Sequence, residues 1–84
     1  MVKENKLLNK DINVNLINLD PEEIIPYHVH KSTKYDYIVK GSISDGKKEY
    51  FSGEIIENIK GSGHSIKAGK NGCEFLVIWC KDSF

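Results

Sequence analysis

Two histidines, His28 and His30, stand one residue apart in the first half of the chain. In a β-strand, residues i and i+2 project from the same face, so both imidazoles would point into the same space. Two ligands of one metal ion need this arrangement, and neutral imidazole suits zinc, nickel, cobalt, copper and iron(II). The third and last histidine, His64, follows a glycine-rich turn at residues 61–63. A fold that brings His64 opposite the pair would complete a site for a divalent transition metal.

Three other side chains close to the histidine pair could take part in chemistry. Lys34 and Asp36 lie two residues apart and would share one strand face. Asp36 could give a carboxylate to the metal or pair with Lys34. The Lys34 ammonium could extend to the mouth of the site, or act as a base or Schiff-base amine if it is buried. Tyr27 flanks His28 and would place a phenol at the mouth of the pocket or in the packed wall of the barrel. We take Lys34, Asp36 and Tyr27 as candidate catalytic residues.

The composition limits the classes of protein to which the chain can belong. Its 84 residues suffice for one domain, and 12 basic residues balance 12 acidic ones to a formal net charge of zero. All the basic residues are lysine, whereas arginine is the preferred reader of guanine and the usual bidentate phosphate ligand. We therefore expect no nucleic-acid partner.

The same composition predicts a cytoplasmic protein without a membrane segment. No apolar run approaches the about 18 residues of a membrane span, and the first ten residues lack the apolar core of a signal peptide. The two cysteines, Cys73 and Cys80, fall in one predicted strand and would lie about 23 Å apart. A disulfide needs Cα atoms within about 7 Å, so both are expected to be free thiols, as is usual in a reducing compartment.

Short alternating or apolar segments, separated by turn residues, recur along the chain and favour strands throughout. The expected strands are residues 11–19, 22–30, 35–43, 47–51, 54–59, 65–68 and 73–80, with a hairpin at Asp45–Gly46 and a turn at residues 69–72. Phe75, Val77 and Trp79 share one face of the last strand and are expected in the core. No helical periodicity is present. The prediction is an all-β fold, a small antiparallel β-barrel or jelly roll, with residues 11–84 as its single domain and residues 1–10 as a flexible segment or dimer arm.

Both histidine segments resemble the two sequence motifs of the cupin superfamily. The first motif, G-x5-H-x-H-x3–4-E-x6-G, matches at His28, His30 and Gly41. The second, G-x5-P-x-G-x2-H-x3-N, matches at Gly53, Gly61 and His64. The resemblance runs from about residue 12 to the end of the chain. It implies a small barrel whose metal-binding histidine positions are filled by all three histidines of this chain.

The chain departs from the cupin motifs at four positions. Glu22, Ile59 and Ala68 replace a glycine, a proline and an asparagine at architectural positions. Lys34 occupies the position of the glutamate ligand, and an ammonium group cannot coordinate a cation. The three-histidine, one-glutamate site of the family is therefore incomplete here, with three protein ligands and open positions.

Two functions of different classes follow. The first is a small metal-dependent enzyme, a dioxygenase, isomerase or lyase, acting on a small polar substrate through His28, His30 and His64. The alternative is a metal-free binding module that holds a small anionic or sugar-like ligand with Lys34; a metal that only stabilises the fold is a third possibility.

A homodimer is also expected. The resemblance to small cupins implies dimers, and the alternation of Ile12, Val14 and Leu16 with Asn13 and Asn15 predicts a half-buried strand near the N-terminus. Such a strand would be prone to aggregation if it formed a free edge. We therefore expect residues from about 7 to 19 in the dimer interface.

Overall fold

Strands separated by tight turns make up the structure, a computed structural model that describes residues 1–80. The strands are β1 (Lys3–Asn9), β2 (Ile12–Leu19), β3 (Ile24–Val29), β4 (Lys34–Ser44), β5 (Glu49–Phe51), β6 (Ile55–Asn58) and β7 (Gly63–Cys80). Every strand pair is antiparallel, which confirms the all-β prediction. Within the described residues, no helix is long and apolar enough to cross a membrane. The expected domain at residues 11–84 extends beyond the described part by its last four residues.

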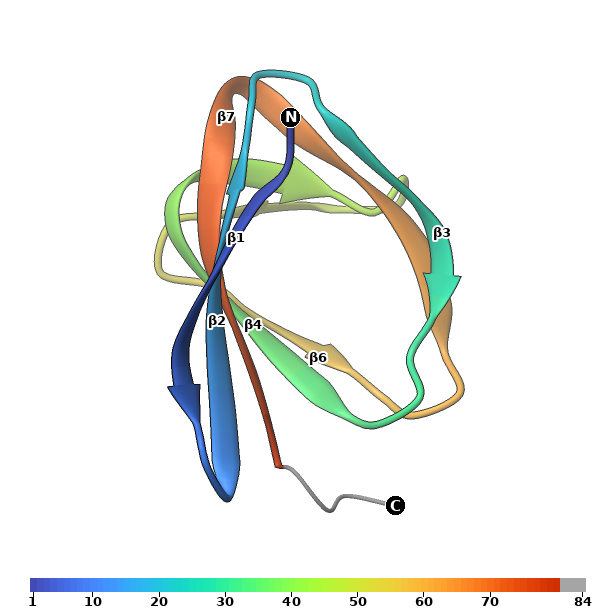
Figure 1. Ribbon diagram of the computed structural model, residues 1–84. Helices are drawn as coiled ribbons and strands as arrows, with labels where there is room; N and C mark the ends of the chain where they lie inside the picture. The colour runs from blue at the N-terminus through green and yellow to red at the C-terminus, as the bar shows by residue number, and fades with distance from the viewer. Residues whose placement is uncertain (81–84) are drawn as a thin grey trace.

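The long strand β7 joins the two walls of the barrel. The strand order is β1-β2-β7-β4-β5, and β3 pairs with β7 while β6 pairs with β4. The first part of β7 pairs with β3, and its last part lies between β2 and β4. Figure 1 shows β7 curving from one wall into the other, with β3 facing β2 and β4 across the barrel. Segments far apart in sequence therefore face a common interior.

The turn expected at residues 69–72 is wrong, because β7 runs through these residues without a break. Gly72 has a φ of 76° and lies against Gly41, which has a φ of 74°. The register between β4 and β7 shifts between Gly41 and Ile43. Glycine tolerates positive φ, and an irregularity of this kind bends a strand without ending it. The glycines here curve the barrel wall.

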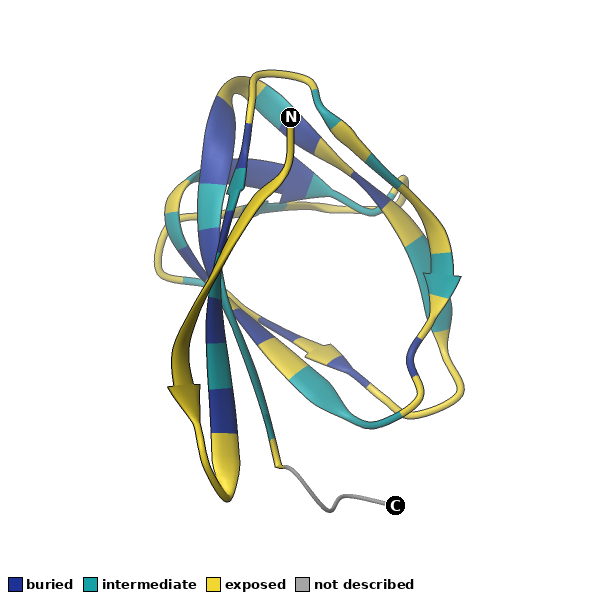
Figure 2. Cartoon of the chain, in the orientation of Figure 1, coloured by how far each residue is buried: buried dark blue, intermediate teal, exposed yellow. Residues whose placement is uncertain are grey.

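Residues 1–10, expected to be a flexible segment or a dimer arm, contain strand β1, because Lys3–Asn9 pairs along the edge of β2. All seven residues of β1 are exposed, as Figure 2 shows. Backbone pairing with the free edge of β2 therefore forms this strand, with little contribution from burial. The composition of the segment alone carries no sign of such pairing.

The core lies between the two walls, and its most deeply buried side chains are Ile38 and Ile43. Figure 2 shows buried residues alternating with less buried ones along the strands. Strand β2 also alternates, but the side that faces inward is not the expected one. Asn13 and Asn15 are buried, and Ile12 is exposed. Ile12, Val14 and Leu16 thus face outward, whereas Ile17 and Leu19 at the end of the strand face the core. Polar groups inside this half of the barrel give its interior a partly polar lining.

Candidate metal centre

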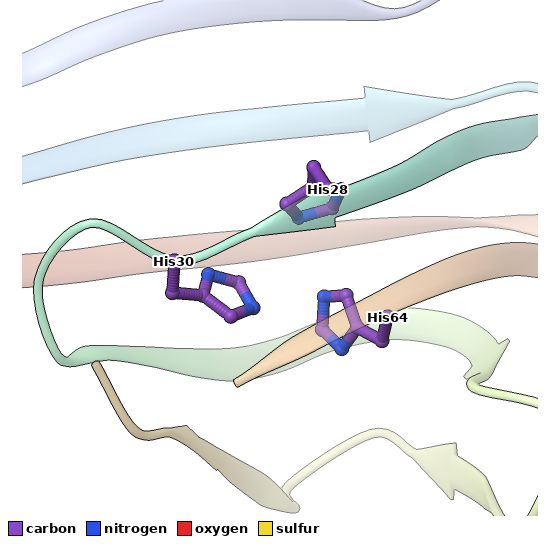
Figure 3. Close-up of side chains that lie close together, drawn as sticks. All are labelled: His28, His30 and His64. Atoms are coloured by element: carbon purple, nitrogen blue, oxygen red, sulfur yellow. The ribbon is translucent and has the colours of Figure 1, made fainter. Parts of the chain in front are cut away.

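The antiparallel pairing of β3 with β7 brings the three histidines together. His28 is the direct cross-strand partner of His64. His30 lies just beyond the end of β3, where its N–H donates to the Ser62 carbonyl at 2.8 Å and its carbonyl accepts from the Gly61 N–H at 2.9 Å. Figure 3 shows the three rings gathered between these segments. Their centroids lie 5.0 Å apart for His28 and His30, 4.8 Å for His28 and His64, and 4.6 Å for His30 and His64.

One ring nitrogen from each histidine lies within 4.8 Å of the others, so the three imidazoles are positioned to hold a single metal ion. Burial lowers the pKa of His30 to about 4, and the neighbouring charges of His64, His28 and Lys34 add to this effect. Burial also lowers the pKa of His64, and the charge of His28 lowers it further. Both side chains are therefore neutral near pH 7, the form of imidazole that binds metals.

Hydrogen bonding around the cluster fits a metal as well. His28 Nδ1 lies 2.9 Å from the Pro26 carbonyl oxygen, which can only accept, so Nδ1 carries the hydrogen and the lone pair is on Nε2. A backbone carbonyl often orients metal-binding histidines in this way. His30 Nε2 is buried and has no hydrogen-bond partner among residues 1–80. An unpaired buried polar atom costs about 1–3 kcal/mol, and a bound metal would remove that cost.

The histidines open into a cavity of about 610 Å³ whose lining includes all six residues singled out from the sequence. Its apolar lining consists mainly of Ile17, Ile25, Ile66, Phe75, Val77 and Trp79. Phe75, Val77 and Trp79 do share one face, as expected, but Phe75 alone is fully buried. A cavity of this size and character is typical of a small-molecule site.

Lys34 lies in the cavity without touching a carboxylate. Its Nζ is 4.7 Å from the centroid of the Trp79 ring, within the range of a cation–π interaction. The ion pair with Asp36 that the sequence allowed is not formed, and no other ion pair involves Lys34 within residues 1–80. The side chain is half-buried, so the ammonium is neither free in solvent nor enclosed in the core.

Asp36 is 5 % exposed, and Asn58 Nδ2 donates to its Oδ2 at 2.9 Å. Burial raises the pKa of this carboxyl to about 6, against the opposing effects of the Asn58 hydrogen bond and the charges of Lys34 and His28. The carboxyl can therefore hold or release a proton close to neutral pH. Its catalytic role, like that of Lys34, stays a prediction.

Tyr27 lies at the rim of the cavity with 68 % of its surface exposed. Its phenol covers Gly63, where a Cβ atom would lie 2.3 Å from the Tyr27 Oη. The glycine therefore permits this position of the ring. The catalytic role suggested for Tyr27 also stays a prediction.

Among the polar residues that line the cavity, Glu4, Asn15 and Asn58 were not identified as site residues from the sequence. Asn58 is the cross-strand partner of Lys34, and Asn15 Nδ2 donates to the Glu4 carboxylate. Strand pairing brings all three to the cavity, and the alternation in β2 was the one signal that could have identified Asn15.

No protein-family model matches the chain, and no curated protein does. Solved structures do match: an RmlC-like cupin from Shewanella frigidimarina has a TM-score of 0.82 at 19 % identity, over 94 % of this chain and 75 % of that chain. The protein has the cupin fold.

Two further matches show how widely this cupin fold is shared. The polyketide cyclase RemF from Streptomyces resistomycificus has a TM-score of 0.85 at 22 % identity, over 98 % of this chain and 66 % of that one. A chain in the crystal structure of Rhodobacter sphaeroides SigE in complex with the anti-sigma ChrR has a TM-score of 0.84 at 18 % identity, over 92 % of this chain. The present chain spans only 44 % of that chain's length. At these identities the likeness concerns the fold alone.

Proposed function

We propose that this cupin binds one divalent transition metal through His28, His30 and His64 and acts as a simple metal-dependent enzyme on a small polar substrate. The observation that carries the proposal is the buried, unpartnered Nε2 of His30 beside two other imidazoles. When bound, such a metal supplies Lewis-acid or redox chemistry. Dioxygenase, isomerase and lyase reactions stay open, and the likeness to a polyketide cyclase supports an enzyme without choosing among them.

Other residues of the cavity would exchange a proton with the substrate, hold it and exclude water. The Asp36 carboxyl, with a pKa near 6, would exchange a proton with the substrate at its Oδ atoms. The Tyr27 phenol at the rim would cover the bound substrate, and the Lys34 ammonium would bind a negatively charged group of the substrate. The apolar walls would exclude water from the rest of the substrate.

A zinc titration against a chromophoric chelator tests the metal site. The wild type is expected to bind about one zinc ion per chain, and His30→Ala is expected to lose about 100-fold or more in affinity, because one of three ligands is removed. Cys80→Ser is the matched control, since Cys80 is an exposed free thiol away from the cluster that could bind zinc unspecifically. Equal affinity of wild type and His30→Ala would contradict the proposed site.

The metal-free binding module is the second candidate function. It is favoured by Lys34 itself, a cation without a carboxylate partner at the position where the cupin motif has an acidic ligand. A protein that binds no zinc, nickel or iron(II) but binds small anions would belong to this class.

We further propose that a second copy of the chain covers the outer face of the sheet. Cross-strand pairing aligns two apolar rows there, Leu8, Val14, Ile78 and Tyr35 in one and Leu16, Leu76, Tyr37 and Ile55 in the other. Paired residues in a sheet share a face, so the rows cross β1, β2, β7, β4 and β6 as one surface. These eight residues carry no charge. The first row continues from Tyr35 to Glu57 on β6, and the second continues from Leu16 to Asn5 on β1, so polar residues lie at the ends of the rows. An isologous dimer through this face would therefore bring no like charges together at its centre.

This homodimer includes the segment at residues 7–19 that the sequence analysis predicted. We also propose a cytoplasmic location, which the two free thiols Cys73 and Cys80 support.

A further inference from the structure

The charged groups that line the cavity differ in whether they have a hydrogen-bond or ion-pair partner. Beside the histidines it is lined by two acids, Glu4 and Asp36, and two lysines, Lys31 and Lys34. Each acid accepts a hydrogen bond from an asparagine side chain, Glu4 from Asn15 and Asp36 from Asn58. Lys31 is exposed to solvent. Lys34 is thus the half-buried cation of the cavity, and no carboxylate of residues 1–80 lies within ion-pair distance of its ammonium.

Trp79 fixes the position of this cation. The indole ring attracts the Lys34 ammonium from one side, with Nζ 4.7 Å from the ring centroid. The ring has no oxygen atom to accept a hydrogen bond from the three N–H donors of the ammonium. A lysine held in this way loses less side-chain entropy when an anion binds than one that moves freely in solvent. Lys34 is therefore prepared to donate hydrogen bonds to a ligand.

The wall that continues from Trp79 along β7 is apolar, and polar side chains flank it: Asn15 and Asp36 pair with Val77 from the two neighbouring strands. Phe75 and Val77 precede Trp79 on the same face of β7, and Ile17 pairs with Phe75 from the neighbouring strand. A ligand group on Lys34 would therefore have an apolar surface beside it and the histidines across the same cavity. A single fixed cation beside an apolar wall suits one negative charge on an apolar body.

We propose that the cavity binds a small organic monocarboxylate, with its carboxylate on the Lys34 ammonium and its apolar body against Phe75, Val77 and Trp79. The inference rests on the proposed function only in taking this cavity as the functional site. It names the ligand class, and it holds for the cupin with or without its metal.

Fluorescence of Trp79 provides the test, because it is the only tryptophan of the chain. The metal-free protein is titrated at neutral pH with three probes, hexanoate, benzoate and phenylacetate, and with 1-hexanol as the neutral counterpart of hexanoate. At least one carboxylate is expected to change the fluorescence saturably, and 1-hexanol to bind about tenfold more weakly than hexanoate, because it cannot make the charged hydrogen bond.

Variants separate the role of the charge from that of the apolar wall. Lys34→Met keeps the apolar stem and is expected to weaken carboxylate binding about tenfold or more, whereas Lys34→Arg should retain it within a few-fold. Lys67→Met is the control, because Lys67 is exposed on β7 and does not line the cavity. Unchanged urea unfolding of the variants shows that they are folded.

No saturable change with any of the three carboxylates would overturn the inference, and so would equal carboxylate affinity of Lys34→Met and the wild type. Zinc binding measured on the same samples separates the two proposals. Zinc binding without carboxylate binding would leave the metal centre standing and refute the ligand class. Carboxylate binding that depends on Lys34 without zinc binding would support the ligand class and refute the metal centre.

Discussion

Replacing Asp36 by asparagine should stabilise the metal-free protein at neutral pH. The Asp36 carboxylate is buried, and its one hydrogen bond comes from Asn58. Asparagine has nearly the same shape, and its side-chain oxygen can accept the same bond without a charge. The substitution therefore removes the cost of burying a negative charge and replaces one carboxylate oxygen by an NH2 group, whose effect does not depend on pH.

The magnitude follows from the pKa of Asp36, which burial raises from 3.8 to about 6. A raised pKa means that the folded state binds the proton more tightly than the unfolded state, so stability is lost as pH rises from 3.8 to about 6. At 1.36 kcal/mol per pKa unit, the ionised carboxylate lowers the free energy of unfolding by about 3 kcal/mol above pH 6. At pH 4 the carboxyl is almost fully protonated in the folded state and only about half ionised in the unfolded state, so the cost falls to about 0.6 kcal/mol.

Urea unfolding of wild type and Asp36→Asn, each in EDTA at pH 4 and pH 7.5, measures this difference. The advantage of Asp36→Asn should be about 2 kcal/mol larger at pH 7.5 than at pH 4. Comparing the two proteins at each pH cancels the contribution of His30, whose lowered pKa destabilises both as the solution is acidified.

Asp45→Asn is the matched control, because backbone hydrogen bonds from Lys47 and Lys48 lower the pKa of Asp45. A lowered pKa contributes stability above the unfolded value, so this variant should be less stable than wild type at pH 7.5, with the difference shrinking towards low pH. An advantage of Asp36→Asn that is the same at both pH values would show that Asp36 is not a buried carboxyl with a raised pKa.

Two other predictions concern the barrel and its outer face. Gly41→Ala should lower the free energy of unfolding by about 3 kcal/mol or more, because its Cβ would lie 2.0 Å from the Gly72 carbonyl oxygen. Gly46 also has a positive φ, but no atom lies within 4 Å of the position of its Cβ. Gly46→Ala should therefore lower the free energy of unfolding by only about 1–2 kcal/mol. Equal losses in urea unfolding would contradict the close approach. Tyr37→Asp should convert the expected dimer to a monomer in sedimentation, whereas Ile24→Asp, an exposed residue outside the two apolar rows, should not. A monomeric wild type at micromolar concentration would refute the dimer.

Strand positions were largely predictable where alternation or a strong turn signal marks them. The strand expected at residues 11–19 is β2 (Ile12–Leu19), and the Asp45–Gly46 hairpin joins β4 to β5. The interruption expected at residues 69–72 failed because glycine allows both a turn and a bend, and only the contact of Gly72 with Gly41 selects the bend. Strand β1 could not be predicted, since all its residues are exposed and the strand depends on pairing with the edge of β2.

In the site, too, some features are predictable from the local sequence pattern, and others depend on how the strands pair. The spacing of His28 and His30 predicts two imidazoles on one side, and the motif spacing adds His64, as the structure has them. Asn58 reaches Asp36 only through the pairing of β6 with β4, which no local pattern encodes. Which side of β2 is buried was also beyond the sequence, because both sides carry apolar residues and the side with Asn13 and Asn15 is the buried one.

Elemental analysis of the purified protein tests the central claim, a metal ion held by three histidines, most directly. The measurement compares wild type with the double variant His28→Ala, His30→Ala after both are incubated with zinc, nickel and iron(II) and desalted. We expect close to one metal ion per wild-type chain and almost none in the double variant. No metal in the wild type, or the same amount in both proteins, would contradict the metal centre.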